Sequence, residues 1–400
     1  MNIAQSLKKK RFADNILVRA GTVLTMVPKQ KPIDNGALLI QPTANGDRIR
    51  AVGSYRSLQK ESYQKVIDLG AVTIAPGLIN AHTHLEISHL AGKTISGQGF
   101  VTWLKSLVPH LEEPPDDKAL AGALKEMRSS GTIFAADMAA RHAGQLAHFL
   151  QKNSFVHWLM AQHFGFATPD SETPLPPTLS EINAPEIVNS DNFCRAGHAF
   201  YSTDAATLQA AKKWSRQKLR PFALHLAESC GESELLLNGC GELADFFRTA
   251  GILPLDFKAP GCSSVAYAEK LDLLDEMTLA IHCVKLNQSD IDTLARHKVN
   301  VCLCPRSNSF INIGRAPWGK LDKAGINLCL GTDSLTSNYD LNLWHELEFL
   351  LTEGKAAINF PTGLKMLTGN PARALAIDTD YGTLEPGKIA AWSVVPEIFL

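Results

Sequence analysis

The residues of this sequence that could do chemistry are histidines and acids that follow short apolar runs. They are His82, His84, His225, Glu228, His282 and Asp333. His82 and His84 are two positions apart, and alternate residues of an extended segment point the same way, so both imidazoles can reach one ion. Three neutral imidazoles and one carboxylate form a donor set that Zn²⁺ or Fe²⁺ favours, with a position left open for water.

None of these residues alone is specific for a metal site. A histidine after a strand is more often a hydrogen-bonded core residue than a ligand, and a glutamate early in a helix is often solvated. The combination is the stronger signal, because four separate apolar runs end in such residues. We therefore expect one divalent ion held by His82, His84, His225 and Asp333, with Zn²⁺ favoured and Fe²⁺ and Mn²⁺ as alternatives.

A metal held by these ligands would allow hydrolysis, because a divalent ion lowers the pKa of bound water to about 7. We expect Asp333 to take the proton of that water, and Glu228, three residues beyond His225, to pass a proton to the substrate. His282 is expected to hydrogen-bond the attacking hydroxide or to complete the coordination shell. Glu228, His282 and Asp333 are therefore the predicted catalytic residues.

Strands of one parallel sheet must bring these residues together, and the apolar runs have the character of such strands. Buried parallel strands are continuously apolar, and each run is followed by a helical stretch, as in repeated βα units. The predicted barrel strands are residues 72–76, 132–138, 155–160, 194–201, 221–226, 278–281, 299–303 and 327–330. They predict an α/β fold, a (β/α)8 TIM barrel, whose catalytic residues lie at the C-terminal strand ends. The candidate residues follow the first, fifth, sixth and eighth strands.

The segments outside the barrel have a different character. Residues 1–70 carry short β-like runs separated by turn-rich pieces, and residues 381–395 return to turns and a strand. Because the two ends of a chain often lie close together, we expect them to form one small β-sandwich domain. The predicted division is residues 1–70 plus 376–400 for the β-domain and residues 71–375 for the barrel.

Composition and charge argue against several kinds of partner. The chain has 39 Lys and Arg against 40 Asp and Glu, a net charge of -1, so no overall field favours nucleic acid or an anionic membrane. It contains no signal-peptide core and no apolar run of about 18 residues. Its 8 scattered cysteines fit a reduced chain better than a disulfide framework. We expect a cytoplasmic protein with a small-molecule substrate, no nucleic-acid or membrane partner, and a homodimer as its assembly.

Several motifs follow one another along nearly the whole chain. They are 76–84 (PGLINAHTH), 197–201 (GHAFY), 225–228 (HLAE), His282, 304–308 (CPRSN), 331–334 (GTDS), 369–372 (GNPA) and 382–388 (GTLEPGK). This series resembles the amidohydrolase superfamily, in particular its branch of one-metal deaminases and triazine hydrolases. The resemblance implies the same four ligands, Glu228 as the proton shuttle, and His198 as a substrate-contacting histidine after the fourth strand. Ser307 and Asn308 are expected to brace the loop after the seventh strand.

The resemblance leaves several reactions open. Binuclear cyclic amide hydrolases normally carry a carboxylated lysine at the end of strand four, but that strand here offers His198, and Lys212 and Lys213 lie more than ten residues later. A one-metal site is therefore favoured, and the Glu228 shuttle favours release of ammonia from a ring carbon. Triazine hydrolysis, guanine- or pterin-like deamination and cyclic amide hydrolysis are the alternatives, followed by a non-catalytic protein of this fold.

The loop after the first strand bears on the substrate. Its segments 85–88 (LEIS), 97–100 (GQGF) and 103–104 (WL) resemble aminodeoxyfutalosine deaminases more than guanine deaminases. We therefore predict deamination of the 6-amino group of an adenine nucleoside of the aminodeoxyfutalosine or methylthioadenosine/S-adenosylhomocysteine type. Glu86, Phe100 and Trp103 are candidate substrate contacts. Phe100 and Trp103, at i and i+3, could instead anchor a helix on the barrel rim.

Overall fold

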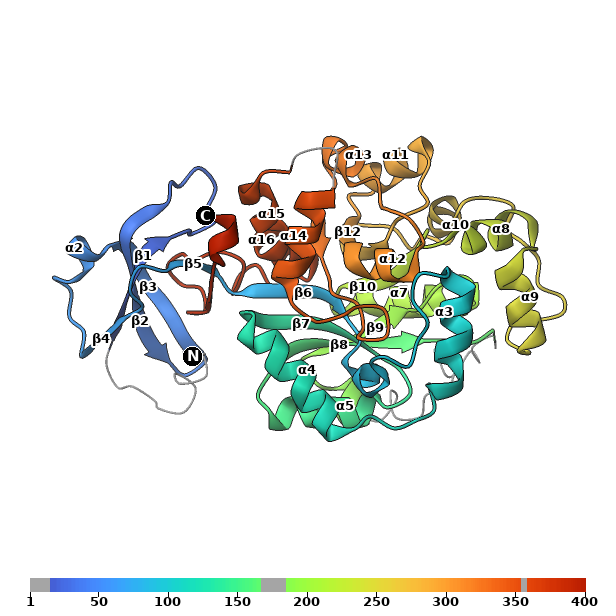
Figure 1. The fold of residues 1–400 in the computed structure, drawn as a ribbon, viewed down its shortest axis with the longest axis horizontal. Coiled ribbons are helices and arrows are strands. Elements are labelled where there is room, and N and C mark those ends of the chain that lie inside the picture. The colour runs from blue at the N-terminus through green and yellow to red at the C-terminus, as the bar shows by residue number, and fades with distance from the viewer. Residues whose placement is uncertain (1–14, 167–184, 354–357) are drawn as a thin grey trace.

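The computed structural model describes residues 15–166, 185–353 and 358–400, and Figure 1 shows the path of the chain. Apolar and β-branched residues near the N-terminus form strands β1 (Ile16–Val23), β2 (Ile33–Thr43), β3 (Gly46–Ser54), β4 (Lys65–Asp68) and β5 (Thr73–Pro76). One hydrogen-bonded sheet joins them to the C-terminal strand β14 (Trp392–Val394), which pairs with β5. The first half of β1 pairs with β4 and its second half pairs with β5. The N- and C-terminal segments that were expected to form a small β-sandwich therefore share one continuous sheet.

The tail of the chain contacts the N-terminal strands. Nη1 of Arg48 lies 2.8 Å from Oδ1 of Asp380, and the backbone N–H of Ile49 donates to the carbonyl of Lys388 at 2.8 Å. The division into residues 1–70 plus 376–400 and residues 71–375 stays a proposal. Residues 1–14 lie outside the described residues. Strand β5, which this division assigns to the barrel, pairs within the small sheet.

The first barrel strand is β6 (Leu78–Thr83), and the prediction that residues 72–76 form it was wrong. Residues 72–81 are mostly apolar, so their composition does not divide them into two strands. The division falls at Gly77, where a Cβ atom would lie 2.6 Å from the side chain of Ile133. The chain therefore leaves the small sheet and enters the barrel at a close approach that only a residue without a side chain permits.

Among the described residues, eight parallel strands form the barrel, in two hydrogen-bonded runs of four. The strands after β6 are β7 (Thr132–Ala139), β8 (Val156–His163), β9 (Phe193–Gly197), β10 (Phe222–Leu226), β11 (Thr278–His282), β12 (Asn300–Leu303) and β13 (Leu328–Leu330). β9 lies next to β10, and a bridge between Thr83 and Asp333 links the end of β6 to the segment after β13. The predicted (β/α)8 barrel is confirmed, and these seven strands lie within four residues of their predicted limits.

Helices follow the barrel strands and surround them (Figure 1). Those of six residues or more are η1 (Leu85–Leu90), α3 (Phe100–Leu107), α4 (Asp117–Ser129), α5 (Ala143–Lys152), α7 (Ala205–Lys218), α8 (Cys230–Asn238), α9 (Glu242–Thr249), α10 (Ser264–Lys270), α11 (Gln288–Arg296), α12 (Pro305–Ile311), α13 (Trp318–Lys323), α14 (Leu343–Glu353), α15 (Phe360–Leu367) and α16 (Gly369–Ala374). The shorter turns are α2 (Tyr55–Leu58), η2 (Val108–His110), α6 (Pro185–Val188) and η3 (Glu397–Phe399). Asp116 caps α4, and Asn287 and Asp290 form a capping box at α11. Each helix in the described segments is too short or too polar to cross a membrane.

Small and medium-sized side chains fill the interior of the barrel. Ile79, Met138, Met160, Leu279 and Ile281 are buried there, and Cys302 and Cys304 pack among them. The barrel is therefore a packed core, and the space for a ligand lies at its mouth.

Candidate active site

Residues from four strand ends meet at the mouth of the barrel. His82 lies in β6 and His84 directly follows it, His225 lies in β10, His282 is the last residue of β11, and Asp333 follows β13. One ring nitrogen from each of His82, His84 and His225 lies within 4.8 Å of the others, and His82, His282 and a carboxylate oxygen of Asp333 form a second group of this kind. Because His82 belongs to both groups, the five side chains form one cluster.

Asp333 faces two of the histidines. Its Oδ1 atom lies 3.4 Å from Nε2 of His82 and 3.6 Å from Nε2 of His84. The hydroxyl of Ser307 donates to Oδ2 at 2.6 Å, and the backbone N–H of Ser334 donates to Oδ1 at 2.8 Å. Burial opposes ionisation of Asp333, but the close approach of His82 holds the pKa of this carboxyl well below its ordinary value. Asp333 is therefore an oriented carboxylate.

Burial favours the neutral form of three histidines of the cluster, His82, His84 and His225. Burial lowers the pKa of His84 to about 3 and holds the pKa of His225 well below its ordinary value. Nδ1 of His225 lies 3.1 Å from the carbonyl oxygen of His198, so Nδ1 carries the proton and Nε2 is free to bind a metal. Both ring nitrogens of His82 are buried without a hydrogen-bond partner among the described residues, which is costly unless a further group pairs with them. This donor set fits a divalent ion such as Zn²⁺.

Glu228 lies beside the cluster, and two side chains hold its carboxyl group. The hydroxyl of Tyr201 donates to Oε2 at 3.0 Å, and Nε2 of His282 lies 3.4 Å from Oε1. Nδ1 of His282 pairs with Oδ1 of Asn308 at 2.9 Å, so the other ring nitrogen is the one that faces Glu228. Burial raises the pKa of Glu228 to about 7. Glu228 can therefore hold or release a proton near neutral pH.

The backbone at the site adopts conformations that side chains other than glycine rarely take. The φ angle is 52° at Ala227, 70° at His282 and 56° at Asp333, and such angles persist only where the surroundings enforce them. At the first of these positions the buried carboxylate of Glu232 accepts hydrogen bonds from the backbone N–H groups of Ala227, at 3.1 Å, and Glu228, at 2.7 Å. Glu232 therefore holds the backbone from which the side chain of Glu228 extends.

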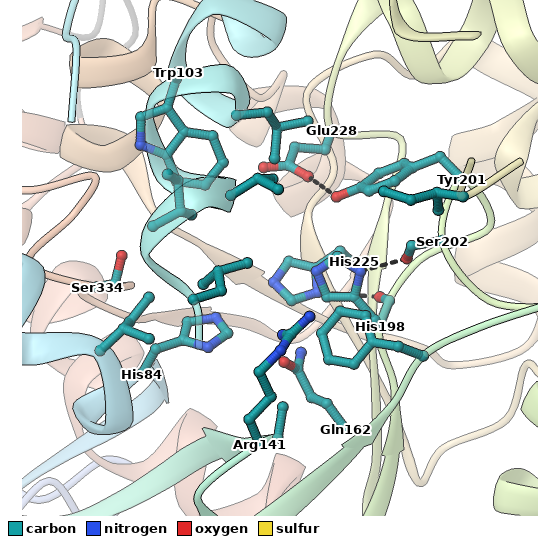
Figure 2. A pocket seen from close by; sticks show the side chains of 18 of the residues that line it. His84, Trp103, Arg141, Gln162, His198, Tyr201, Ser202, His225, Glu228 and Ser334 are labelled. Carbon is teal, nitrogen blue, oxygen red and sulfur yellow. Dashed lines mark hydrogen bonds between the residues drawn. The ribbon is translucent and has the colours of Figure 1, made fainter. Parts of the chain in front are cut away.

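A cavity of about 430 Å³ opens onto the cluster. His84, His225 and Glu228 line one part of it, and Figure 2 shows them facing the open space. Among the lining residues to which the sequence analysis gave no role are Arg141, Gln162 and Tyr201. Each lies at or just beyond the C-terminal end of a barrel strand. That position was the available signal, but these residue types do not mark a metal site, and Tyr201 entered only as the last residue of the motif 197–201.

Two of the predicted substrate contacts, His198 and Trp103, line the cavity. Nδ1 of His198 pairs with the hydroxyl of Ser202 at 2.5 Å, and the indole N–H of Trp103 donates to the carbonyl of Thr336 at 2.8 Å. These bonds orient both rings, and their contact with substrate stays a prediction.

The other two predicted contacts, Glu86 and Phe100, have different surroundings. Glu86 borders the cavity, but its carboxylate accepts hydrogen bonds from the backbone N–H groups of Ala140, at 2.8 Å, and His142. Phe100 is not among the described residues that line the cavity. Its ring packs 5.7 Å from the ring of Trp103 and 5.7 Å from that of Tyr201. These ring contacts favour the alternative in which Phe100 anchors the helix at the rim, and its contact with substrate stays a prediction.

The chain resembles known proteins over nearly its whole length. It is 30% identical to a 5-methylthioadenosine/S-adenosylhomocysteine deaminase of Syntrophobacter fumaroxidans, over 96% of this chain and 84% of the relative. It is 26% identical to a 5'-deoxyadenosine deaminase of Methanothrix thermoacetophila, over 86% of this chain and 80% of the relative.

Solved structures share the fold. A zinc-bound adenosine deaminase from Xanthomonas campestris has a TM-score of 0.77 at 24% identity, over 95% of this chain and 84% of that one. The aminofutalosine deaminase of Helicobacter pylori in complex with methylthio-coformycin has a TM-score of 0.81 at 20% identity, over 94% and 91%. The model of the amidohydrolase family matches residues 73–399. With this match added to the barrel and its histidine cluster, the chain belongs to the amidohydrolase family.

Proposed function

We propose that this chain is a metal-dependent hydrolase that removes the 6-amino group of an adenine-containing nucleoside and releases ammonia. The bond that breaks is the C–N bond of a cyclic amidine. Relatives aligned over most of their length are deaminases of 5-methylthioadenosine, S-adenosylhomocysteine and 5'-deoxyadenosine, which supports this substrate class.

The observation that carries the proposal is the place of Glu228 beside the cluster. Its buried carboxyl, with a pKa of about 7, lies 3.4 Å from Nε2 of His282. Hydrolysis at an amino-bearing ring carbon needs such a group, because the ring nitrogen must gain a proton and the amine must leave as ammonia. A halide leaving group needs this help less, so triazine dehalogenation is the weaker candidate.

One divalent ion, Zn²⁺ in first place, would be held by His82, His84, His225 and Asp333. When bound, the ion would supply the Lewis acidity that makes water nucleophilic at neutral pH. Asp333 takes the proton of the attacking water. Glu228 protonates the ring nitrogen beside the reacting carbon.

The remaining steps break the C–N bond. Asp333 returns its proton to the amino group as this bond breaks, and the proton left on the attacking oxygen passes to Glu228, which leaves a ring carbonyl and free ammonia. His282, oriented by Asn308, hydrogen-bonds the attacking oxygen. His198 and Trp103 are the proposed substrate contacts.

The assembly and the location of the protein remain predictions, which are a homodimer and the cytoplasm.

The experiment that tests this function joins metal analysis to a screen for ammonia release. The substrates are adenine nucleosides with varied 5' substituents, guanine, pterins, aminotriazines and cyclic amides. We expect ammonia from adenine nucleosides at rates above those for the other classes. Turnover of a cyclic amide with no ammonia from any aminated ring would overturn the proposal.

A further inference from the structure

We infer that Asp137 is a positioning residue of the proposed metal site. Its carboxyl group accepts the first N–H group of the helix that begins after His84, which leaves the imidazole of His84 free to face the ion. This inference rests on the metal site of the proposed function and deepens it. Asp137 lies in β7, its side chain is fully buried, and it is not among the described residues that line the cavity. Its effect on the reaction therefore passes through another residue.

His84 does not satisfy the start of this helix itself. It occupies the N-cap position of η1, where a side chain usually pairs with one of the first N–H groups of a helix. The imidazole of His84 makes no such bond, and its Nε2 atom faces Oδ1 of Asp333 at 3.6 Å. The next residue, Leu85, is buried, so its N–H group is shielded from water. Without a partner from elsewhere in the chain, this N–H group would be unpaired.

Asp137 supplies the missing acceptor. Its Oδ1 atom accepts a hydrogen bond from the backbone N–H of Leu85 at 3.1 Å. β6 and β7 are neighbouring parallel strands (Figure 1), and their last paired residues are Thr83 and Asp137. Because the backbone pairing ends there, the carboxyl group of Asp137 carries the contact between the two segments further along the chain. The residue after His84 is thereby tied to β7.

The residues on either side of Leu85 are held by the same part of the barrel. The ring of His84 hydrogen-bonds the backbone of Met138. The carboxylate of Glu86 accepts hydrogen bonds from two backbone N–H groups just beyond β7. Three consecutive residues after β6 therefore contact the end of β7, and the bond to Asp137 is the central one. Its loss would free the backbone that carries His84.

A purely structural role accounts poorly for a carboxyl group at this position. Ala135 and Ala139, which lie on the same face of β7, pack with Leu85 in an apolar cluster. Oδ2 of Asp137 is buried without a hydrogen-bond partner among the described residues, and burial raises the pKa of the group well above its ordinary value. An unpaired buried polar atom costs free energy that an apolar side chain would avoid. The bond to the N–H of Leu85 is the contact that explains a carboxyl group here.

The affinity of the metal-free protein for Zn²⁺ tests the inference, measured without substrate by competition with a chromophoric chelator. Asp137→Val removes the acceptor and replaces it with an apolar side chain that suits a buried strand. We expect the dissociation constant of Zn²⁺ to rise by about 10- to 100-fold, the usual effect of losing an outer contact of a metal ligand. Asp137→Asn keeps an oxygen atom for the N–H of Leu85 and should bind Zn²⁺ nearly as the wild-type protein does.

A matched control and a spectrum separate positioning from folding. Asp68→Ala removes the same kind of bond in the small sheet, from an aspartate to the backbone N–H of Gly70 at 2.9 Å, and should leave the Zn²⁺ affinity unchanged. The free energy of unfolding of each metal-free protein is measured in urea. The visible absorption of the Co²⁺-loaded protein reports the arrangement of the ligands, and it should change in Asp137→Val but not in Asp137→Asn or Asp68→Ala.

The outcome that would overturn the inference is an Asp137→Val variant that is less stable but binds Zn²⁺ as tightly as the wild-type protein. Asp137→Ala, which matches the alanines two positions away on either side, gives the same readout if the valine variant does not fold. An equal loss of Zn²⁺ affinity in Asp137→Asn and Asp137→Val would also overturn the inference, because the bond to Leu85 would then not be the contact that matters.

Ammonia release is recorded in parallel, so that the inference and the proposed function can fail separately. Weakened Zn²⁺ binding in Asp137→Val, with no ammonia from any adenine nucleoside in the loaded wild-type protein, would count against the function and not against the inference. Ammonia release by the wild-type protein, with the same Zn²⁺ affinity in both proteins, would count against the inference alone.

Discussion

The amide oxygen of Asn308 lies 2.9 Å from Nδ1 of His282 and thereby directs the other ring nitrogen to Glu228, at 3.4 Å. The preceding residue, Ser307, donates to Asp333 at 2.6 Å. Two neighbouring residues at the start of α12 therefore orient two of the three proposed catalytic side chains. This part of the site depends on a helix that contributes no metal ligand.

Asn308→Ala should lower kcat without loss of metal. The imidazole of His282 would lose the contact that sets its orientation and tautomer, and such outer contacts are typically worth about 10- to 100-fold in activity. Steady-state kinetics with metal analysis checks this, and Ser309→Ala, an exposed neighbour on the same helix, is the control. A fall in bound metal that parallels the fall in kcat would count against the proposed role.

Glu228→Gln should keep the metal and lose turnover. The amide preserves the shape of the side chain and cannot transfer a proton, and a positioned acid or base typically contributes about 10²- to 10⁴-fold. Ammonia release per bound metal is the measurement, with Glu61→Gln, an exposed glutamate near the small sheet, as the control. A fully active Glu228→Gln variant would show that the proton shuttle is a different group.

Tyr201→Phe should shift the pH profile. The pKa of Glu228 is raised to about 7 by burial, and the hydroxyl of Tyr201 counteracts this rise by donating to the ionised carboxylate. Because the proton of Glu228 is used in the reaction, activity should fall as pH rises through about 7. Without the tyrosine hydroxyl the pKa rises further, so the basic limb should move to higher pH. A limb that stays in place, or moves to lower pH, would contradict this link.

Glu346→Gln should weaken the dependence of stability on pH. Glu346 is fully buried, and it accepts hydrogen bonds from Asn338 and from the backbone N–H of Arg306. Burial raises its pKa from 4.5 to about 8. Because the pKa of Glu346 is higher in the folded than in the unfolded protein, its protonated form contributes to the free energy of unfolding. This contribution is complete below the unfolded-state pKa and is lost as pH rises through about 8.

Thermal unfolding from pH 5 to pH 9 measures this effect. The Tm of the wild-type protein should fall toward high pH more steeply than the Tm of Glu346→Gln. Parallel curves for the two proteins would show that Glu346 does not titrate in this range.

The ligand cluster could be predicted because its residues have distinctive types and follow recognisable strands. His225 and Asp333, far apart in sequence, meet because parallel strands end at one mouth. The limits of the first strand could not be predicted, because the break at Gly77 coincides with a close contact to Ile133 in the neighbouring strand β7. The role of Glu86 was also hidden, since its partners are backbone groups at positions 140 and 142.

Titration of the metal-free protein with Zn²⁺, with ammonia release from an adenine nucleoside measured at each step, tests the central claim most directly. A one-metal deaminase predicts that ammonia release rises to a plateau at one bound ion per chain. It also predicts that His225→Ala neither retains this ion nor releases ammonia, whereas His297→Ala, which removes a histidine paired with Glu269 outside the cluster, behaves as the wild-type protein does. A plateau at two ions per chain, or a metal-loaded protein that releases no ammonia, would contradict the account.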